Sequence, residues 1–279
     1  MKKLEGAARA LFFVSACASV FLAALICFFI FFNGVPALIS IGPLEFLGGK
    51  KWQPLQGVFG ILPMITGSLC VTAIALGIGV PAGIFTAVYL ARFCPKPLYR
   101  LFKPAVDLLA GIPSVVFGFF ALQVFVPVVR EISGGSGTSM IAAALVLSMM
   151  ILPTIISVSE AAIRTVPESY FEGSLALGAS VERSVFFAVL PAARSGIAAA
   201  VILGAGRAFG ETMAVLMVAG NQAVMPRGLF KGLRTLTTNI ALEMGYAANL
   251  HRDALIATAV VLFVFILVIN IAFAFTNRK

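Results

Sequence analysis

The sequence predicts an all-α integral membrane protein with six transmembrane helices and both termini in the cytoplasm. Hydrophobic residues make up 61% of the 279 residues and charged residues only 11%, and the mean hydropathy is +1.07. A soluble domain carries roughly 25% charged residues, because its surface must stay solvated. The apolar residues also gather in six long runs, and a segment that crosses lipid must satisfy its backbone hydrogen bonds internally, as a helix does.

The six apolar runs set the domain organisation. They cover residues 10–32, 61–91, 104–129, 140–158, 196–220 and 254–275. The first run follows two lysines and stays uncharged for 23 residues, which is long enough to cross a hydrocarbon core of about 30 Å, so we expect an uncleaved span rather than a signal peptide. We divide the chain into an N-terminal helix with its external loop (1–60) and a transmembrane core (61–279), whose cytoplasmic loop covers 159–195.

The basic residues set the orientation. With the N-terminus in the cytoplasm, 12 Lys and Arg residues fall in the inner segments and 7 in the outer loops, which is the bias that cytoplasmic loops show. The outer loop 221–252 carries four basic residues, suited either to attracting an anion or acidic partner or to simple solvation. The scattered charges do not indicate a nucleic-acid-binding face. Four cysteines without a CxxC pair and a single histidine do not indicate a metal site.

The cytoplasmic loop 159–195 has the pattern of a docking surface. Pro167 is suited to begin a short helix, and Gly178 permits the turn that ends it. A second short helix then reaches Leu190 and Pro191. Two short helices hinged at a glycine would fit a groove in another protein; the alternative is an ordinary amphipathic loop.

This loop resembles the E-A-A–G–L-P loop of binding-protein-dependent ABC importers. Glu172, Gly178, Leu190 and Pro191 keep the spacing, although Gly-Ser stands in place of Ala-Ala and Ala188 stands where isoleucine is usual. In that family the loop docks on the ATPase and transmits its closure to the membrane helices. The resemblance therefore implies a type I ABC importer permease architecture, with these four residues in the coupling loop. The sequence carries no phosphate-binding loop with its lysine, so the ATPase must be another chain.

Two charges lie inside the fifth apolar run. Arg207 stands near the middle of residues 196–220, where a charge costs roughly 2.5–3.5 kcal/mol and normally faces a cavity or a partner. Spaced i to i+4 on one helix, Arg207 and Glu211 are predicted to pair. The planar guanidinium suits phosphate because it donates two parallel hydrogen bonds. We assign Arg207, Glu211 and Thr212 to a substrate pathway; the alternative is a salt bridge that only packs helices.

A second pathway element is predicted in the third apolar run. Gly111, Pro113 and Gly118 can unwind or kink the helix and free backbone groups to line a pathway. We assign Gly111, Pro113 and Ser114 to this helix break.

Three longer motifs resemble the PstC-type permeases of bacterial phosphate importers. They cover residues 110–120, 210–221 and 238–245, and the likeness extends from about 59 to 275. The resemblance implies a permease subunit that moves inorganic phosphate across the cytoplasmic (inner) membrane, in contact with membrane lipid, and that catalyses no covalent chemistry and needs no cofactor.

The family also implies three partners. These are a second permease of the PstA type, an ATPase dimer of the PstB type, and a periplasmic or lipid-anchored phosphate-binding protein; no nucleic acid is implied. Two alternatives remain open from the residues. One is an importer of the same architecture for sulfate or molybdate, and the other is an ATP-independent anion carrier.

Overall fold

The computed structural model describes the backbone of residues 2–276 and the side chains of residues 9–271. The chain is almost wholly helical, with one short antiparallel hairpin. The long helices are α1 (Lys2–Ile41), α3 (Leu62–Val88), α5 (Ser114–Ser133), α6 (Met140–Arg164), α10 (Arg194–Gly210) and α13 (Asn249–Thr276). The shorter elements are α2 (Pro43–Gly48), β1 (Trp52–Gln53), η1 (Pro54–Gln56), β2 (Val58–Phe59), the π-helical η2 (Tyr89–Phe93), α4 (Lys96–Gly111), α7 (Glu168–Ala176), α8 (Val181–Ser184), the π-helical η3 (Val185–Val189), α9 (Leu190–Ala192), α11 (Met213–Val218) and α12 (Leu236–Glu243).

The all-α membrane fold is confirmed. Within the described residues, five helices are long and apolar enough to cross a membrane, namely Arg9–Ile41, Leu62–Phe93, Ser114–Ser133, Met140–Arg164 and Asn249–Ile271. A sixth span is obtained if the bent pair Val181–Ala192 and Arg194–Gly210, which meet at 71°, is counted as one.

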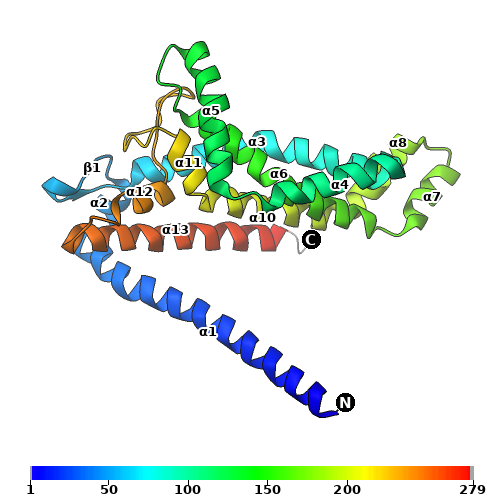
Figure 1. The fold of residues 1–279 in the computed structure, drawn as a ribbon, viewed down its shortest axis with the longest axis horizontal. Helices are drawn as coiled ribbons and strands as arrows, with labels where there is room; N and C mark the ends of the chain where they lie inside the picture. Colours follow the sequence, from blue (N-terminus) through cyan, green and yellow to red (C-terminus); the bar gives the residue numbers. More distant parts are fainter. Residues whose placement is uncertain (1, 277–279) are drawn as a thin grey trace.

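Helix α6 is the centre of the bundle (Figure 1). Its apolar window is the most buried of the five, and it packs extensively against α3 and α10. Glycines make these helix crossings close. A Cβ at Gly79 of α3 would lie 2.8 Å from Ile151 Cδ1, and one at Gly204 of α10 would lie 3.0 Å from Ile155 Cγ1. Small residues at helix contacts let backbones approach in lipid, where packing rather than hydrophobicity drives association.

This packing predicts a contrast between two glycines of α3. Gly79→Leu would push into Ile151 and should lower the melting temperature of the detergent-purified chain by about 5 °C, since overpacking costs about 1–3 kcal/mol. Gly77→Leu is the matched control, because a Cβ there meets nothing within 4 Å. Equal melting temperatures for the two variants would contradict the α3–α6 contact.

Most of the predicted spans have different bounds in the structure, and the first of them continues as α1 to Ile41, nine residues beyond 32. The run 104–129 is not one helix, because the chain breaks at Ile112 and Pro113, between α4 and α5. The run 196–220 breaks after Gly210, so that α10 and α11 are separate helices. The fourth span continues to Arg164, six residues beyond 158, and this shortens the predicted loop 159–195 at its start.

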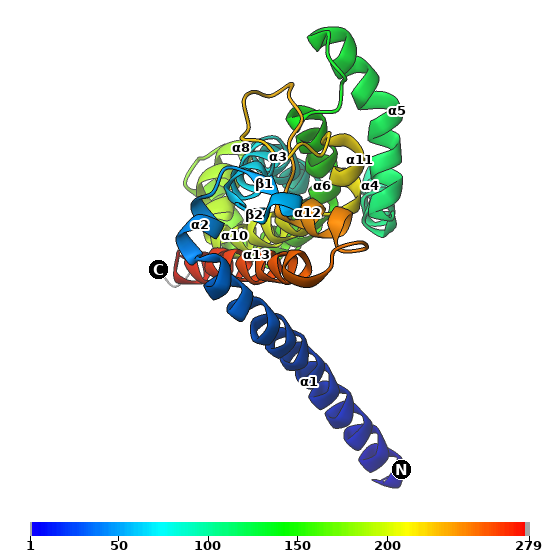
Figure 2. The same ribbon diagram turned by 90° about the vertical axis from the view of Figure 1, so that its left-hand side faces the viewer.

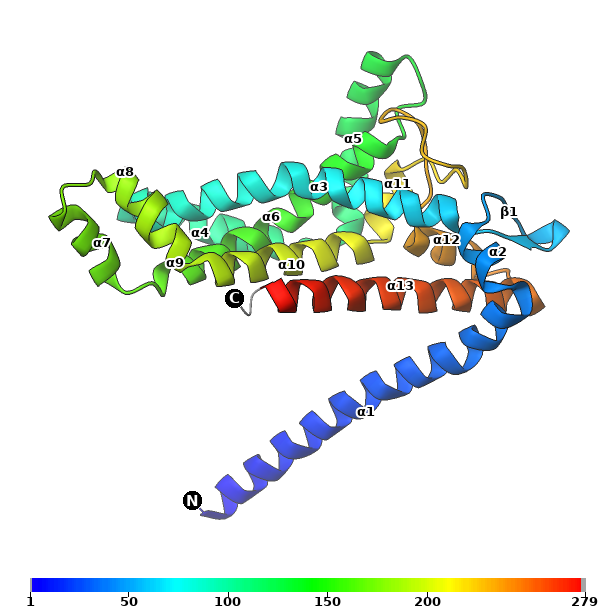
Figure 3. The same cartoon turned by 180° about the vertical axis from the view of Figure 1, so that it is seen from behind.

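The two ends of the bundle carry different structures. In Figure 1, α7 and α8 project at one end, and β1, α2 and α12 gather at the opposite end. The start of α1 and the end of α13 both lie toward the α7 end, as Figure 3 shows from behind. Helix α1 diverges from the bundle (Figure 2) and packs mainly on α13.

Candidate functional site

The predicted two-helix loop forms as a compact projection. Helix α7 follows Pro167, whose extended backbone (φ −55°, ψ 137°) precedes its first turn. Gly178 follows α7 with φ +86°, a left-handed conformation that glycine adopts without steric cost. Ser180 then begins α8 by accepting a hydrogen bond from the Arg183 N–H at 3.3 Å, as N-cap residues do. The glycine hinge is therefore present between the two helices.

Side chains fix this projection to the membrane helices. Arg92 Nη1, at the end of η2, lies 2.8 Å from Glu168 Oε2 in the first turn of α7. Within the loop, Ser184 Oγ donates to Ser174 Oγ at 2.9 Å and joins α8 to α7. Val185 is fully buried against the ends of α3 and α6. A displacement of α7 would therefore be transmitted to α3 and α6.

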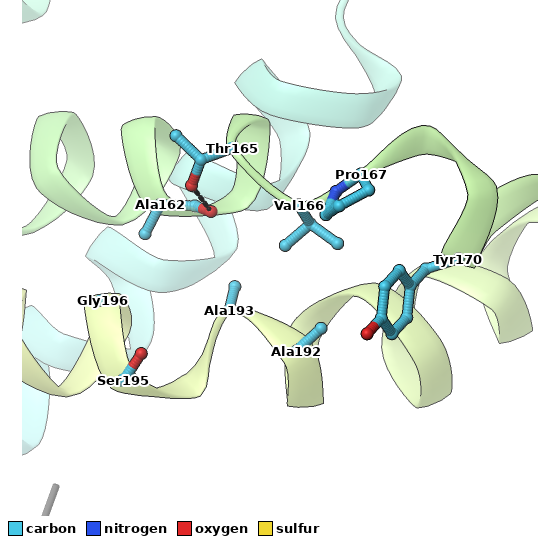
Figure 4. Close-up of a pocket in the computed structure, with 9 residues that line it drawn as sticks. All are labelled: Ala162, Thr165, Val166, Pro167, Tyr170, Ala192, Ala193, Ser195 and Gly196. Atoms are coloured by element: carbon cyan, nitrogen blue, oxygen red, sulfur yellow. Dashed lines mark hydrogen bonds between the residues drawn. The ribbon is translucent and has the colours of Figure 1, made fainter.

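The outer surface of the projection remains exposed. Leu177, beside the hinge, is 91% exposed, and Glu172 and Pro191 are exposed while Leu190 is partly buried. Tyr170 and Phe187 of the same projection are also exposed, so its apolar side chains are accessible to a partner protein. A cavity of about 280 Å³ lies between the end of α6 and the start of α10, and Tyr170 of α7 is one of its lining residues (Figure 4).

The predicted pairing of Arg207 with Glu211 is wrong. Helix α10 ends at Gly210, and Glu211 adopts an extended conformation (φ −69°, ψ 135°), so the two side chains do not share a helix face. Glu211 Oε1 instead accepts the backbone N–H of Ala214 at 3.2 Å and caps the start of α11. The Glu211 carbonyl accepts the Thr237 hydroxyl at 2.8 Å. This tertiary contact stabilises the extended backbone between α10 and α11.

Arg207 lies beside a part of α10 that the described residues leave open. Its Nη1 lies 3.4 Å from the hydroxyl of Thr154 on α6, and it forms no ion pair with any residue that the structure describes. A Cβ at Gly206 or Gly210 would meet nothing within 4 Å. Neither glycine therefore makes a close helix contact with the residues that the structure describes. Thr212 is half-buried in the break, where its hydroxyl donates to the Gly210 carbonyl at 3.4 Å.

The break predicted in the third run is present. Gly111 is the last residue of α4, Pro113 is extended (φ −59°, ψ 143°), and Ser114 begins α5. Gly111 and Pro113 are exposed. Gly118, however, stays helical and gives α5 its close contact with α11, since a Cβ there would lie 2.9 Å from Ala214 Cα. The two broken helices are thus packed together through α5 and α11.

Sequence reasoning missed a buried charge network at the opposite end of the molecule from α7. Glu243 of α12 accepts from Trp52 Nε1 at 2.8 Å, pairs with His251 Nε2 at 2.8 Å, and pairs with Arg234 Nη1. Arg234 also donates to Asn239 Oδ1 at 3.0 Å. The network joins β1, α12 and α13. The sequence did contain one indication of this network. The only Trp and the only His of the chain both fall in segments predicted to be external.

The network predicts a pH-dependent stability. Burial opposes ionisation of Glu243, but hydrogen bonds from Trp52, His251 and Arg234 outweigh it and hold the pKa of Glu243 below its usual 4.5. A lowered folded-state pKa gives stability that is complete above about pH 4.5 and lost as the pH falls through the folded value.

Glu243→Gln should lower the melting temperature by roughly 10 °C at pH 7, because it leaves the half-buried Arg234 without its carboxylate partner. This difference should shrink as the pH falls below 4.5 and through the lower folded-state pKa of Glu243, where the wild-type side chain also becomes neutral. Fluorescence emission from Trp52 during thermal unfolding measures the melting temperature. Substitution of the exposed Glu131, Glu131→Gln, is the control. A pH-independent difference would contradict this account.

Several helices long and apolar enough to cross a membrane, an exposed two-helix projection and an arginine with no ion pair among the described residues are features of a transport permease subunit. Residues 79–279 match the family of binding-protein-dependent transport system inner membrane components, and the chain belongs to that family. It is a multi-pass inner membrane protein. Permeases of this family are not themselves enzymes and work with ATPase and substrate-binding partners.

Individual relatives support the family, and two of the three described here are named for phosphate while the other is named without a substrate. The chain is 40% identical to the probable ABC transporter permease protein YqgH of Bacillus subtilis, covering 95% of this chain and 90% of the relative. It is 35% identical to the phosphate transport system permease protein PstC of Mesorhizobium japonicum, covering 84% and 78%. It is also 35% identical to PstC of Haemophilus influenzae, covering 79% and 76%.

Solved structures share the fold. The inward-facing MetNI methionine ABC transporter has a TM-score of 0.64 at 22% identity, covering 82% of this chain and 98% of that one. A bacterial ABC transporter for the import of alginate has a TM-score of 0.60 at 15% identity, covering 94% and 95%. These structures confirm the type I importer permease architecture.

Proposed function

We propose that the chain is the PstC-type permease of a phosphate importer and forms half of its pathway. The observation that carries the proposal is Arg207, an arginine in the middle of a broken span with no carboxylate partner in the part of the chain that the structure describes. A charge held there at a cost of several kcal/mol requires a ligand or a partner. The named function of the PstC relatives supports phosphate as that ligand.

The open face of α10 supports a pathway shared with a second permease. Space is open at Gly206 and Gly210, which flank Arg207 in the sequence, and no side chain within residues 9–271 closes it. A PstA-type permease would supply the opposite wall. A PstB-type ATPase dimer would bind α7, and an external phosphate-binding protein would deliver the substrate to the end that carries β1 and α12.

Substrate competition in the assembled and reconstituted complex tests this function. ATP hydrolysis should be stimulated by phosphate with its binding protein, and neither sulfate nor molybdate should replace phosphate. Stimulation by sulfate or molybdate instead would identify another oxyanion importer. Phosphate transport by this chain alone, without ATP, would identify an anion carrier and contradict the proposal.

Orientation has its own test. We expect both termini and α7 in the cytoplasm, with 33–60, 130–139 and 221–252 outside. In a chain without its native cysteines, Gly134→Cys should react with an impermeant maleimide in intact cells, and Glu182→Cys should react only after lysis. The reverse labelling pattern would invert the topology.

A further inference from the structure

A basic pocket lies where α3 ends and α4 begins, apart from the proposed pathway. It has a volume of about 320 Å³ and is lined by Arg92, Lys96, Arg100 and Arg164 together with Tyr99 and Cys94. No carboxylate lines it. The pocket forms because the π-helical η2 ends at Phe93 and Pro95 redirects the chain into α4.

Two of the four basic side chains are fixed by acidic partners outside the pocket. Arg164 Nε lies 2.8 Å from Glu160 Oε1, its Nη2 donates to the Leu90 carbonyl at 2.8 Å, and its guanidinium lies over the Tyr99 ring at 4.6 Å. Arg92 Nη1 is held by Glu168. These contacts position both guanidinium groups before any ligand arrives.

The remaining basic groups are uncompensated. Lys96 and Arg100 are exposed and form no ion pair within residues 9–271. Arg92 Nε is buried and has no hydrogen-bond partner, which carries a desolvation cost unless an acceptor binds there. The pocket thus has about two unbalanced positive charges and an unused buried donor, a combination suited to an anion with several oxygens, such as a phosphate group.

The surroundings of the pocket place it at a bilayer surface. The membrane-spanning segment of α3 and η2 ends at Phe93, so residues 94–100 lie at the level of the headgroups. Helix α4 is amphipathic, and it exposes Leu98, Leu101 and Phe102 beside the basic residues. Helix α4 runs back along α6, since Lys103 Nζ lies 3.5 Å from Glu160 Oε2 and Ser157 Oγ donates to Asp107 Oδ1 at 3.3 Å, so its first turns begin at this surface.

We propose that this pocket binds the phosphate of an anionic phospholipid headgroup. Basic pockets between membrane helices recognise such headgroups, and the apolar residues of α4 would contact the acyl chains. A bound headgroup would also lie next to Arg92, which anchors α7 through Glu168. The proposal does not depend on which substrate the permease transports.

Protection of Cys94 provides the test. The full chain carrying Cys17→Ala, Cys27→Ala and Cys70→Ala is placed in nanodiscs of phosphatidylcholine alone or mixed with phosphatidylglycerol. The rate of Cys94 alkylation by uncharged N-ethylmaleimide is then measured. We expect phosphatidylglycerol to slow the reaction several-fold. The phosphatidylglycerol fraction that gives half of the full protection measures the relative affinity of the pocket for this lipid.

Two charge-matched variants distinguish the pocket from general surface charge. Lys96→Gln/Arg100→Gln should weaken protection roughly 30-fold, since each basic side chain near an anionic surface contributes roughly fivefold. Arg9→Gln/Arg183→Gln removes two exposed charges outside the pocket and should leave protection unchanged.

Three results would overturn the proposal. One is equal alkylation rates in the two lipid compositions, and another is equal loss of protection in the two charge variants. The third is equivalent protection by millimolar inorganic phosphate in phosphatidylcholine nanodiscs, which would show that the pocket takes free phosphate rather than a headgroup.

Discussion

Arg207→Ala should reduce phosphate uptake by the assembled complex by more than about 100-fold. The arginine can donate two charge-assisted hydrogen bonds to one phosphate, each contributing about 1.5–3 kcal/mol, and alanine donates none. Arg207→Lys keeps the charge but loses the planar fork, so uptake should fall less. Uptake of radiolabelled phosphate into proteoliposomes gives the transport rate of each variant relative to wild type. Co-purification with the partner subunits shows that each variant assembles.

Two control variants separate a substrate contact from a structural role. Glu211→Gln keeps an oxygen that can accept from the Ala214 N–H and should retain most of the uptake. Thr154→Val removes the hydroxyl beside Arg207 and should have a small effect. If Arg207→Gln/Glu211→Gln transports phosphate at the wild-type rate, Arg207 does not contact the substrate.

Gly178→Val should abolish phosphate-stimulated ATP hydrolysis while the chain still inserts and assembles. At φ +86° a β-branched residue is strongly disfavoured, because the left-handed conformation costs roughly 1–2 kcal/mol even for an ordinary L-residue. A Cβ at Gly178 would meet nothing within 4 Å, so strain in the backbone is the sole direct effect. Relief of this strain would move α7 relative to α8 and displace the ATPase contact.

Substitutions at the same and a neighbouring glycine check this reasoning. Gly178→Asn should retain much of the stimulation, since asparagine tolerates the left-handed region. Gly173→Val lies within α7, where a Cβ also meets nothing, and should retain it as well. Gly178→Asp adds charge at the contact and is expected to lose coupling even though its backbone is tolerated. Wild-type stimulation in Gly178→Val would remove the hinge from the mechanism.

Local chemistry explains which breaks the sequence could predict. Pro113 removes a backbone donor and restricts the residue before it, and Gly178 permits a left-handed turn, so both breaks can be predicted from a few adjacent residues. The break after Gly210 has no proline. It is held by the Thr237 hydroxyl on the Glu211 carbonyl, a contact between residues 26 positions apart that periodicity does not encode.

The same distinction applies to the charged residues. The position of Arg207 in a membrane span was evident from its apolar neighbours, but its partner was predicted wrongly because the helix was assumed to be continuous. The Trp52–Glu243 bond joins residues 191 positions apart. No local pattern connects them, and only the tertiary fold brings the hairpin onto α12.

Helix α1 also determines how the chain responds to membranes of different thickness. At 40 residues and about 1.5 Å per residue, it is roughly 60 Å long, about twice the hydrocarbon core. It approaches α13 closely at Gly34, where a Cβ would lie 2.6 Å from Val260 Cγ2. Its apolar stretch can therefore change tilt about this crossing to relieve hydrophobic mismatch. The packing of α3, α6 and α10 then need not change with bilayer thickness. The transport rate should therefore vary little with the acyl-chain length of the lipid.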